Sequence, residues 1–438
     1  MRLFGTDGVR GVANRDLTPE LALALGRAAA VELGGSARAR VLIARDTRLS
    51  GEMLEAALSA GLMSAGADVV SAGVLPTAGV AYLAERHGFS AGVMISASHN
   101  PVQDNGIKFF AGDGHKLPDA VEDRIERRMQ DGSEMPIGEG IGQRSEEAAL
   151  REEYIAHLTS LVRCPYPHGV VLDGAHGAAT AVLPLAFSPA ASTVAVIAGE
   201  PDGGRINVGC GSTAPQYLAE HYRAFGGTIG LAFDGDADRL IAIDEEGEVA
   251  DGDVILALLA TWLKGRGELE PATIALTVMS NGGVRDFLAA RGIQSVETKV
   301  GDRYVIEAMR EGNILLGGEQ SGHIIYRRAA TTGDGLATGI LLLSALAEMQ
   351  VRLADFRRQV PRYPQRLRSV RVADREASLN AERYAAVLQE AERALAGVGR
   401  VLVRPSGTEP VVRVMVEARH AEVADAWLER LCTALGGD

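Results

Sequence analysis

The chain has 438 residues, of which 47% are hydrophobic and 23% charged, and its formal net charge at pH 7 is −13. This length exceeds what one ordinary hydrophobic core organises and predicts about three domains. The acidic balance argues against a nucleic-acid-binding protein, which needs a basic face.

The sequence also predicts neither a secreted nor a membrane protein. Its start, MRLFGTDGVRGV, has charge and glycine where a signal peptide has an apolar run. No stretch approaches the roughly 20 apolar residues of a membrane span. Cys164, Cys210 and Cys432 lack CxxC spacing and indicate neither a disulfide framework nor a zinc site. We therefore expect a cytoplasmic protein with no membrane and no nucleic-acid partner.

In chain order, short β-branched runs ending in polar loops alternate with helical stretches. The first helix is predicted from Thr18, an N-cap followed by proline. Ser50 is the predicted cap of the next, whose Leu54, Leu58 and Leu62 lie four apart on one face. The strand-and-loop runs are VLIARDTRLSG from Val41, GVMISASHNP from Gly92, VVLDGAHG from Val170, IGLAFDGDADR from Ile229, IALTVMSNGG from Ile274 and ILLGGEQSGH from Ile314.

This alternation predicts an α/β protein, because strands separated by helices form mainly parallel sheets. We expect three related α/β domains with mixed, mainly parallel sheets plus a smaller C-terminal α+β domain around a central cleft. A linker is predicted from Asp131 to Glu147, a further break in DEEGEVADGD (244–253), and a hinge in PRYPQR (361–366). The predicted domains are a phosphoserine-loop domain (1–146), a metal-binding domain (147–250), a sugar-binding domain (251–362) and a phosphate-binding domain (363–438).

The loop DGDADR places Asp234, Asp236 and Asp238 two residues apart. In an extended segment these carboxylates line one face, where they repel one another unless a cation lies between them. Oxygen ligands suit Mg²⁺, Mn²⁺ or Ca²⁺ rather than zinc. An EF-hand, which Glu245 at its last position favours, needs glycine where Arg239 stands. An exposed acidic turn without metal is the other alternative to a divalent-metal site.

Two further polar loops have residues suited to a phosphorylated sugar. RPSGTEPVVR, from Arg404 to Arg413, offers forked donors, hydroxyls and close backbone N–H groups for a phosphate, and its alternative is an ordinary turn. GGEQSGH alternates Glu319 and Ser321, which could hydrogen-bond vicinal hydroxyls, or be a small polar turn only. Walker-type and GxGxxG patterns are absent, so an ATP-binding kinase is not supported.

Ser98 lies in ISASHNPVQDNGIKFF, directly before His99. Neighbouring side chains of an extended chain point to opposite sides, so His99 is a poor base for Ser98. No GxSxG nucleophile elbow is present either. The local sequence alone therefore predicts a serine without a triad.

Four motifs in one order, SASHNP, DGDADR, GGEQSGH and RPSGTEP, resemble those of the α-D-phosphohexomutase superfamily. FGTDGVRG, ARDTRLSG, DNGIKFF, INVGCGST and VGDRY add to the likeness, which extends from Phe4 to beyond Val416. The details resemble the glucosamine-phosphate branch most, because Gln320 gives GEQSGH rather than the GEMSGH typical of phosphomannomutase/phosphoglucomutase. Ala237 stands where the family often has glycine, and we expect its methyl group not to disturb metal ligation.

The resemblance implies that Ser98 is carried as a phosphoserine and that its phosphate joins the three aspartates around one Mg²⁺ per chain. Lys108 matches the family's general acid/base, and we expect nearby cations to lower its pKa. The remaining implied site residues are Arg10 and His323 near the reacting phosphate, Arg239 beside the metal, Glu319 and Ser321 at the sugar hydroxyls, and Arg404, Ser406, Gly407, Thr408 and Arg413 at the other phosphate.

The implied reaction interconverts glucosamine 6-phosphate and glucosamine 1-phosphate, on the route to UDP-N-acetylglucosamine and peptidoglycan precursors. It passes through a 1,6-bisphosphate, so glucosamine or glucose 1,6-bisphosphate is the expected activator. The partner is a small phosphosugar, and the resemblance also implies a homodimer. The alternatives are a phosphomannomutase/phosphoglucomutase, a hydrolase with Ser98 as nucleophile, and a non-catalytic protein that binds metal or sugar phosphate.

Overall fold

The computed structural model describes residues 2–5, 7–34, 38–130, 134–405 and 410–436. The chain divides into two compact units, which are described separately. The first comprises Met1–Met279 with Ile293–Arg358, and the second Ser280–Gly292 with Gln359–Asp438. The unit boundary at Arg358 lies close to the predicted hinge in PRYPQR.

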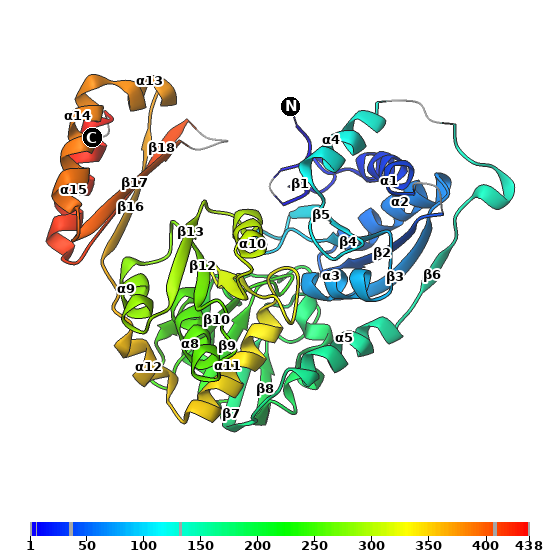
Figure 1. Cartoon of the computed structure of the whole chain (residues 1–438). Coiled ribbons are helices and arrows are strands. Elements are labelled where there is room, and N and C mark those ends of the chain that lie inside the picture. The colour runs from blue at the N-terminus through cyan, green and yellow to red at the C-terminus, as the bar shows by residue number, and fades with distance from the viewer. Residues whose placement is uncertain (1, 6, 35–37, 131–133, 406–409, 437–438) are drawn as a thin grey trace. The chain divides into compact units, whose positions relative to one another are not determined.

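The first sheet has the strand order β1-β5-β4-β2-β3-β6. Strands β4, β2, β3 and β6 are parallel, whereas β5 and β1 are antiparallel additions at one edge. Figure 1 shows α1, α2 and α4 on one side of this sheet and α3 on the other. The bounds are β1 Val9–Val12, α1 Pro19–Leu33, β2 Arg40–Arg45, α2 Gly51–Ser64, β3 Asp68–Val74, α3 Thr77–Arg86, β4 Ala91–Ile95, β5 Asp104–Ala111, α4 Asp119–Arg128, η1 Gly138–Gly140 and β6 Arg144–Glu146.

Three local predictions can be compared with this sheet. Thr18 is confirmed as the α1 cap, since its side chain accepts a hydrogen bond from the Leu21 N–H at 3.3 Å. Ser50 precedes α2 but makes no side-chain cap; its hydroxyl instead accepts a hydrogen bond from Asn105 Nδ2 at 2.9 Å. The predicted linker is partly wrong, because its end forms β6 and pairs with β3.

The second and third sheets repeat the same design of parallel strands with an antiparallel edge. Their orders are β11-β10-β9-β7-β8 and β13-β12-β14-β15. Within the second, β9, β7 and β8 are parallel; within the third, β13, β12 and β14 are. The bounds are α5 Ala149–Ser160, β7 Tyr166–Asp173, η2 Ala178–Ala181, α6 Leu183–Phe187, β8 Ala191–Ile197, α7 Pro215–His221, β9 Ile229–Phe233, β10 Leu240–Ile243, β11 Val249–Ala250, α8 Gly252–Gly265, β12 Thr273–Thr277, β13 Gln294–Thr298, α10 Asp302–Glu311, β14 Leu316–Gly318 and β15 Ile324–Tyr326.

Helix α11 (Gly335–Met349) is apolar along most of its length and is buried in the first unit. Its N-cap is Asp334, whose carboxylate accepts a hydrogen bond from the Ala337 N–H at 2.9 Å. Among the described residues no single helix is long and apolar enough to cross a membrane, although α11 with α12 (Leu353–Gln359) passes as a bent pair on length and composition.

The second unit is built on an antiparallel sheet in the order β16-β18-β17. Apolar side chains of β18 and of helices α14 and α15 form its core. Its bounds are α9 Gly282–Ala290, β16 Gln365–Arg371, α13 Arg375–Asn380, α14 Glu382–Leu395, β17 Gly399–Pro405, β18 Val411–Ala418 and α15 Ala421–Ala434. The predicted α/β class, with three related mixed sheets and a smaller α+β part, is confirmed.

Candidate active site

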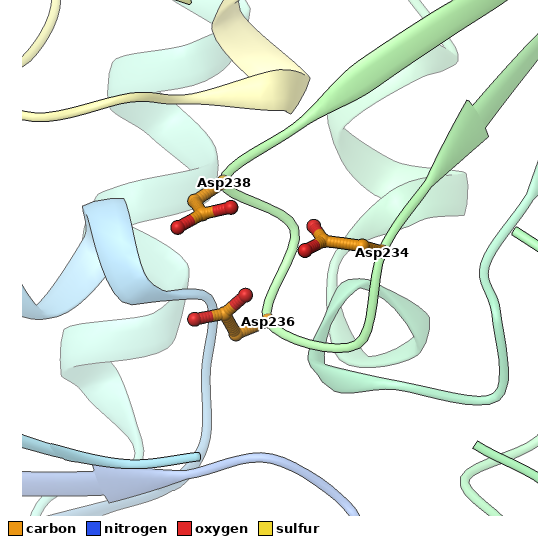
Figure 2. A group of neighbouring side chains, drawn as sticks. All are labelled: Asp234, Asp236 and Asp238. Carbon is orange, nitrogen blue, oxygen red and sulfur yellow. The ribbon is translucent and has the colours of Figure 1, made fainter. Parts of the chain in front are cut away.

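Three buried aspartates form a cluster on the turn between β9 and β10, with their carboxylates directed toward one another (Figure 2). One carboxylate oxygen from each of Asp234, Asp236 and Asp238 lies within 4.8 Å of the others. The predicted cluster is therefore present, but its predicted extended backbone is wrong. Ala237 adopts a left-handed φ of 60°, and its N–H bonds the Asp234 carbonyl at 3.0 Å, so a tight turn gathers the three side chains.

The aspartate cluster fits a hard divalent cation. Oδ1 of Asp236 and Oδ1 of Asp238 are buried and have no hydrogen-bond partner among the described residues. A buried carboxylate oxygen without a partner costs free energy, and a cation bound between such oxygens removes that cost. Aspartate oxygens favour Mg²⁺, Mn²⁺ or Ca²⁺ over softer metals.

Side chains of β5, of the loop after β4 and of the first turn of α3 reach two of these carboxylates. Ser98 Oγ donates a hydrogen bond to Asp234 Oδ2 at 2.6 Å. Asp236 Oδ2 accepts one from Lys108 Nζ at 2.7 Å and another from Thr77 Oγ1 at 2.6 Å. Both donors of Asp236 thus bind the same oxygen, which leaves its buried Oδ1 without a hydrogen bond among the described residues.

The third sheet contributes His323, which follows the β14 turn. Its Nδ1 lies 3.5 Å from Asp238 Oδ2, and Arg239 Nε lies 3.8 Å from Asp238 Oδ1. Loops at the carboxyl ends of β4, β9 and β14 therefore meet at one place, as expected for ligand sites of α/β sheets.

Electrostatics hold Lys108 and His323 in their charged forms. Burial alone would lower the pKa of Lys108, but the charges of Asp236, Asp7 and Asp238 outweigh it and raise that pKa above its ordinary value. For His323, burial opposes Asp238, and the carboxylate raises the pKa to about 9. The prediction of a lowered lysine pKa is wrong here, because the three carboxylates outweigh both burial and the nearby charge of Arg10.

The pKa values of Asp234 and Asp238 are shifted in opposite directions. Burial, followed by the charges of Asp238 and Asp236, raises the pKa of Asp234 well above its ordinary value. Burial also disfavours the ionised form of Asp238, but His323, Lys108 and Arg239 more than compensate and lower its pKa.

Ser98 has a left-handed φ of 53° and is 2% exposed. This turn brings His99 Nδ1 to 3.1 Å from Ser98 Oγ, so the prediction that the two side chains diverge is wrong. Burial, and then the charge of Arg239, lowers the pKa of His99 to about 4. Among the described residues no carboxylate hydrogen-bonds the His99 ring, and the Ser98 hydroxyl donates to Asp234 instead. A serine-hydrolase triad is therefore not assembled in this part of the chain.

A cleft of 360 Å³ lies over this cluster. Its lining includes six of the predicted site residues: Arg10, Ser98, Asp238, Arg239, Glu319 and His323. Lys108 is 2% exposed and lies beneath them. Asp7, which the sequence interpretation overlooked, forms ion pairs with Arg10, with Lys108 at 3.2 Å and with Lys116 at 2.5 Å.

In the predicted sugar loop, Glu319 lines the cleft, whereas the side chain of Gln320 contacts another segment. Glu319 Oε1 accepts a hydrogen bond from the Gly301 N–H at 3.0 Å, and its Oε2 accepts one from Ser321 Oγ at 3.3 Å. Gln320 Nε2 lies 3.4 Å from Asp251, the N-cap of α8. Gln320, the residue from which the preference for glucosamine phosphate was predicted, therefore contacts the N-cap of a helix.

The predicted phosphate loop belongs to the second unit. Arg404 on β17 and Arg413 on β18 are directly opposite one another in the strand register, so their side chains share one face. Ser406, Gly407 and Thr408, the other predicted members, lie outside the described residues.

Comparison with known proteins gives matches over most of the chain. Models of the phosphoglucomutase/phosphomannomutase family match residues 1–135 (alpha/beta/alpha domain I), 251–363 (alpha/beta/alpha domain III) and 367–434 (C-terminal domain).

Two relatives that match nearly the whole chain are named phosphoglucosamine mutase. The chain is 49% identical to a phosphoglucosamine mutase of Moorella thermoacetica, over 99% of this chain and 100% of the relative. It is 50% identical to that of Thermoanaerobacter pseudethanolicus, over 95% of each. Among solved structures, a phosphoglucomutase/phosphomannomutase family protein from Burkholderia thailandensis superimposes with a TM-score of 0.83 at 25% identity, covering 100% of this chain and 98% of that one.

Proposed function

Since the chain belongs to the phosphoglucomutase/phosphomannomutase family and is a phosphohexomutase, we propose that it interconverts glucosamine 6-phosphate and glucosamine 1-phosphate. The name shared by relatives of about 50% identity supports this choice of sugar. The observation that carries the mechanism is that Ser98 Oγ lies 2.6 Å from Asp234 Oδ2, while Lys108 Nζ lies 2.7 Å from Asp236 Oδ2 of the same cluster.

Ser98 is the proposed carrier of the phosphoryl group. A sugar hydroxyl attacks the phosphorus of phosphoserine, the bond from phosphorus to Ser98 Oγ breaks, and the hydroxyl proton passes on balance to Oγ. The product of this half-reaction is a 1,6-bisphosphate, whose other phosphate returns to Ser98 in the second half. Arg10, His323 and Arg239, which line the cleft as cations, stabilise the phosphoryl charge.

Lys108 is the proposed group that takes and returns the proton. It is buried beside Asp236 and Asp7, so it acts as a base only if the charge of Asp236 is shared with another cation. His99 lies 3.1 Å from Ser98 Oγ but has no role in proton transfer in this mechanism, because a phosphoserine donor needs no base to activate it.

One Mg²⁺ per chain is the proposed cofactor. Asp234, Asp236 and Asp238 would hold it with a phosphate oxygen on Ser98. The buried Oδ1 atoms of Asp236 and Asp238, which accept no hydrogen bond among the described residues, support this assignment. When bound, the ion would supply positive charge to the phosphoryl group.

The remaining assignments concern the bound sugar and the setting of the enzyme. Glu319 and Ser321 are proposed to hold sugar hydroxyls, and glucosamine or glucose 1,6-bisphosphate to activate the enzyme. We also propose domain boundaries after residues 146, 250 and 362, and a homodimer. A cytoplasmic location is proposed as well, and the three free cysteines support it. The proposed contacts of the distal phosphate are Arg404, Ser406, Gly407, Thr408 and Arg413.

The test is a side-by-side mutase assay on glucosamine, glucose and mannose phosphates, each with Mg²⁺ and the matching bisphosphate. We expect preference for glucosamine phosphate; preference for another hexose would assign this chain to the phosphomannomutase/phosphoglucomutase type. Ser98→Ala should abolish turnover and leave Mg²⁺ binding measurable. Ser90→Ala, a serine at the opposite end of β4, is the control, and turnover by Ser98→Ala would overturn the phosphoserine mechanism.

A further inference from the structure

Arg48, in the loop that follows β2, is 1% exposed and uses every N–H of its guanidinium group in a hydrogen bond. Its Nε donates to Asp46 Oδ2 at 3.0 Å. The two terminal nitrogens donate to four backbone carbonyls of one neighbouring segment. These carbonyls belong to Pro101 at 2.6 Å, Asp104 at 2.9 Å, Ser98 at 2.9 Å and Asn100 at 2.8 Å.

These four carbonyls lie in the segment that begins with Ser98. It has no regular secondary structure before β5, and Ser98 itself adopts the left-handed conformation that residues with a side chain disfavour. Contacts from elsewhere must therefore fix its backbone. Arg48 supplies four of them from a single side chain.

Two further contacts complete the support of Ser98. Its N–H donates to Ser96 Oγ at 2.9 Å, and that hydroxyl donates to Asp46 Oδ2 at 2.6 Å. The oxygen of Asp46 that accepts from Arg48 is therefore also linked to Ser98 through Ser96. From the loop that follows β8, Asn207 Nδ2 donates to the Ser98 carbonyl at 2.9 Å. That carbonyl thus accepts hydrogen bonds from two segments that are far apart in sequence.

Only an arginine can make this set of contacts. A planar guanidinium directs five N–H groups outward in fixed directions, whereas a lysine has three donors on one atom. Buried charge is also balanced, since the guanidinium is paired with the fully buried carboxylate of Asp46. Burial raises the pKa of Asp46 to about 6, and Arg48 acts against that rise.

We propose that Arg48 is a positioning residue for phosphoryl transfer, which keeps the Ser98 backbone in place while Ser98 gains and loses its phosphate. This inference rests on the proposed role of Ser98 as phosphoryl carrier. Each half-reaction changes the charge on Ser98 by about two units, which displaces an unsupported loop toward or away from the aspartates. A misplacement of about 1 Å at a reacting centre can cost roughly 100-fold in rate.

The experiment compares Arg48→Met and Arg48→Lys with the parent enzyme and with Arg45→Met. Arg45 ends the same strand, β2, and its guanidinium pairs with Glu52 at 2.8 Å and Glu55 at 3.0 Å, so it is a matched loss of a partly buried arginine. The measurements are kcat and KM for the preferred hexose phosphate, Mg²⁺ affinity by calorimetry, thermal unfolding, and phosphoserine occupancy by intact mass.

We expect folded Arg48→Met to lose about 10- to 100-fold in kcat, with KM and Mg²⁺ affinity changed by less than about threefold. Arg48→Lys should recover part of the loss, and Arg45→Met should keep its kcat. A purely structural role predicts instead a lower melting temperature with normal kcat per folded molecule. That result, or an equal loss in Arg45→Met, would overturn the proposal.

If Arg48→Met does not fold, Arg48→Lys and Asn207→Ala decide. Asn207→Ala removes the second donor to the Ser98 carbonyl, so the proposal predicts a several-fold lower kcat per folded molecule; full activity in both variants refutes it. The Ser98→Ala enzyme distinguishes failure of the proposed function from failure of the positioning role of Arg48. Turnover without Ser98 refutes the proposed function, whereas loss there with normal Arg48 variants refutes only the positioning role.

Discussion

Replacing Lys108 with methionine tests whether this lysine and a metal ion compete for the same carboxylates. The ammonium group lies 2.7 Å from Asp236 Oδ2, 3.2 Å from Asp7 Oδ2 and 3.9 Å from Asp238 Oδ2, and it is 2% exposed. Methionine keeps most of the volume and removes the charge. Turnover should be lost, but two binding and stability effects of opposite sign are the more informative result.

The first effect is a loss of stability without metal. Removing one partner of a buried ion pair costs about 3–5 kcal/mol, because the other charge stays buried without compensation. The second is tighter metal binding. A positive charge beside Asp236 opposes a cation at the cluster. Its removal should lower the Mg²⁺ Kd by at least about tenfold, because tenfold corresponds to about 1.4 kcal/mol and Coulomb terms at such distances amount to about 1–4 kcal/mol. Added Mg²⁺ should then raise the melting temperature more for the variant than for the parent enzyme.

Lys116→Met is the matched control. Lys116 is also a largely buried lysine, whose Nζ lies 2.5 Å from Asp7 and 2.6 Å from Asp302. In the described structure no ion pair joins it to the aspartate cluster. It should lose stability without a comparable gain in Mg²⁺ affinity. Calorimetric titration of both variants with Mg²⁺ measures the difference. An unchanged or weaker Mg²⁺ affinity in Lys108→Met would refute the idea that the lysine and the metal share Asp236.

Two further substitutions test the turn that carries the aspartates. Ala237→Gly should stabilise the protein by about 1 kcal/mol in thermal or urea unfolding, because the φ of 60° strains a residue with a Cβ; a loss of stability would contradict this. Thr77→Val removes the 2.6 Å hydrogen bond that fixes Asp236 Oδ2, and should weaken Mg²⁺ binding by about tenfold in calorimetry while Thr159→Val, at the surface of α5, does not. Equal Mg²⁺ affinity in the two threonine variants would show that Thr77 does not orient the ligand.

The sequence predicted which loops meet, because strand–loop–helix repeats determine where strand ends lie. Ser98, the aspartates and His323 follow β4, β9 and β14, and the parallel sheets bring those loops together. Predictions that assumed an extended backbone were less successful. The left-handed conformations of Ser98 and Ala237 determine the contact with His99 and the gathering of the carboxylates, and neither is evident from residue type.

Contacts between distant segments account for the rest. The pKa of Lys108 depends on Asp7, about a hundred residues earlier, and on the cluster near residue 236. Thr77 and Asn207 look like ordinary polar loop residues until the sheets pack. Arg48, within ARDTRLSG, resembles a solvated surface arginine in sequence, yet it is among the most buried side chains.

The charges around the cleft give a reason for the metal and the phosphoserine to belong together. Acidic and cationic side chains lie together there: Asp7, Asp234, Asp236 and Asp238 form ion pairs with Arg10, Lys108, Arg239 and His323. A divalent cation alone would add two positive charges, and a serine phosphate alone about two negative ones. Bound together they leave the existing balance unchanged. We therefore expect Mg²⁺ to bind more tightly to the phosphorylated enzyme than to the dephosphorylated one, and calorimetry on the two forms, separated by intact mass, measures this difference; equal affinities would contradict a shared site.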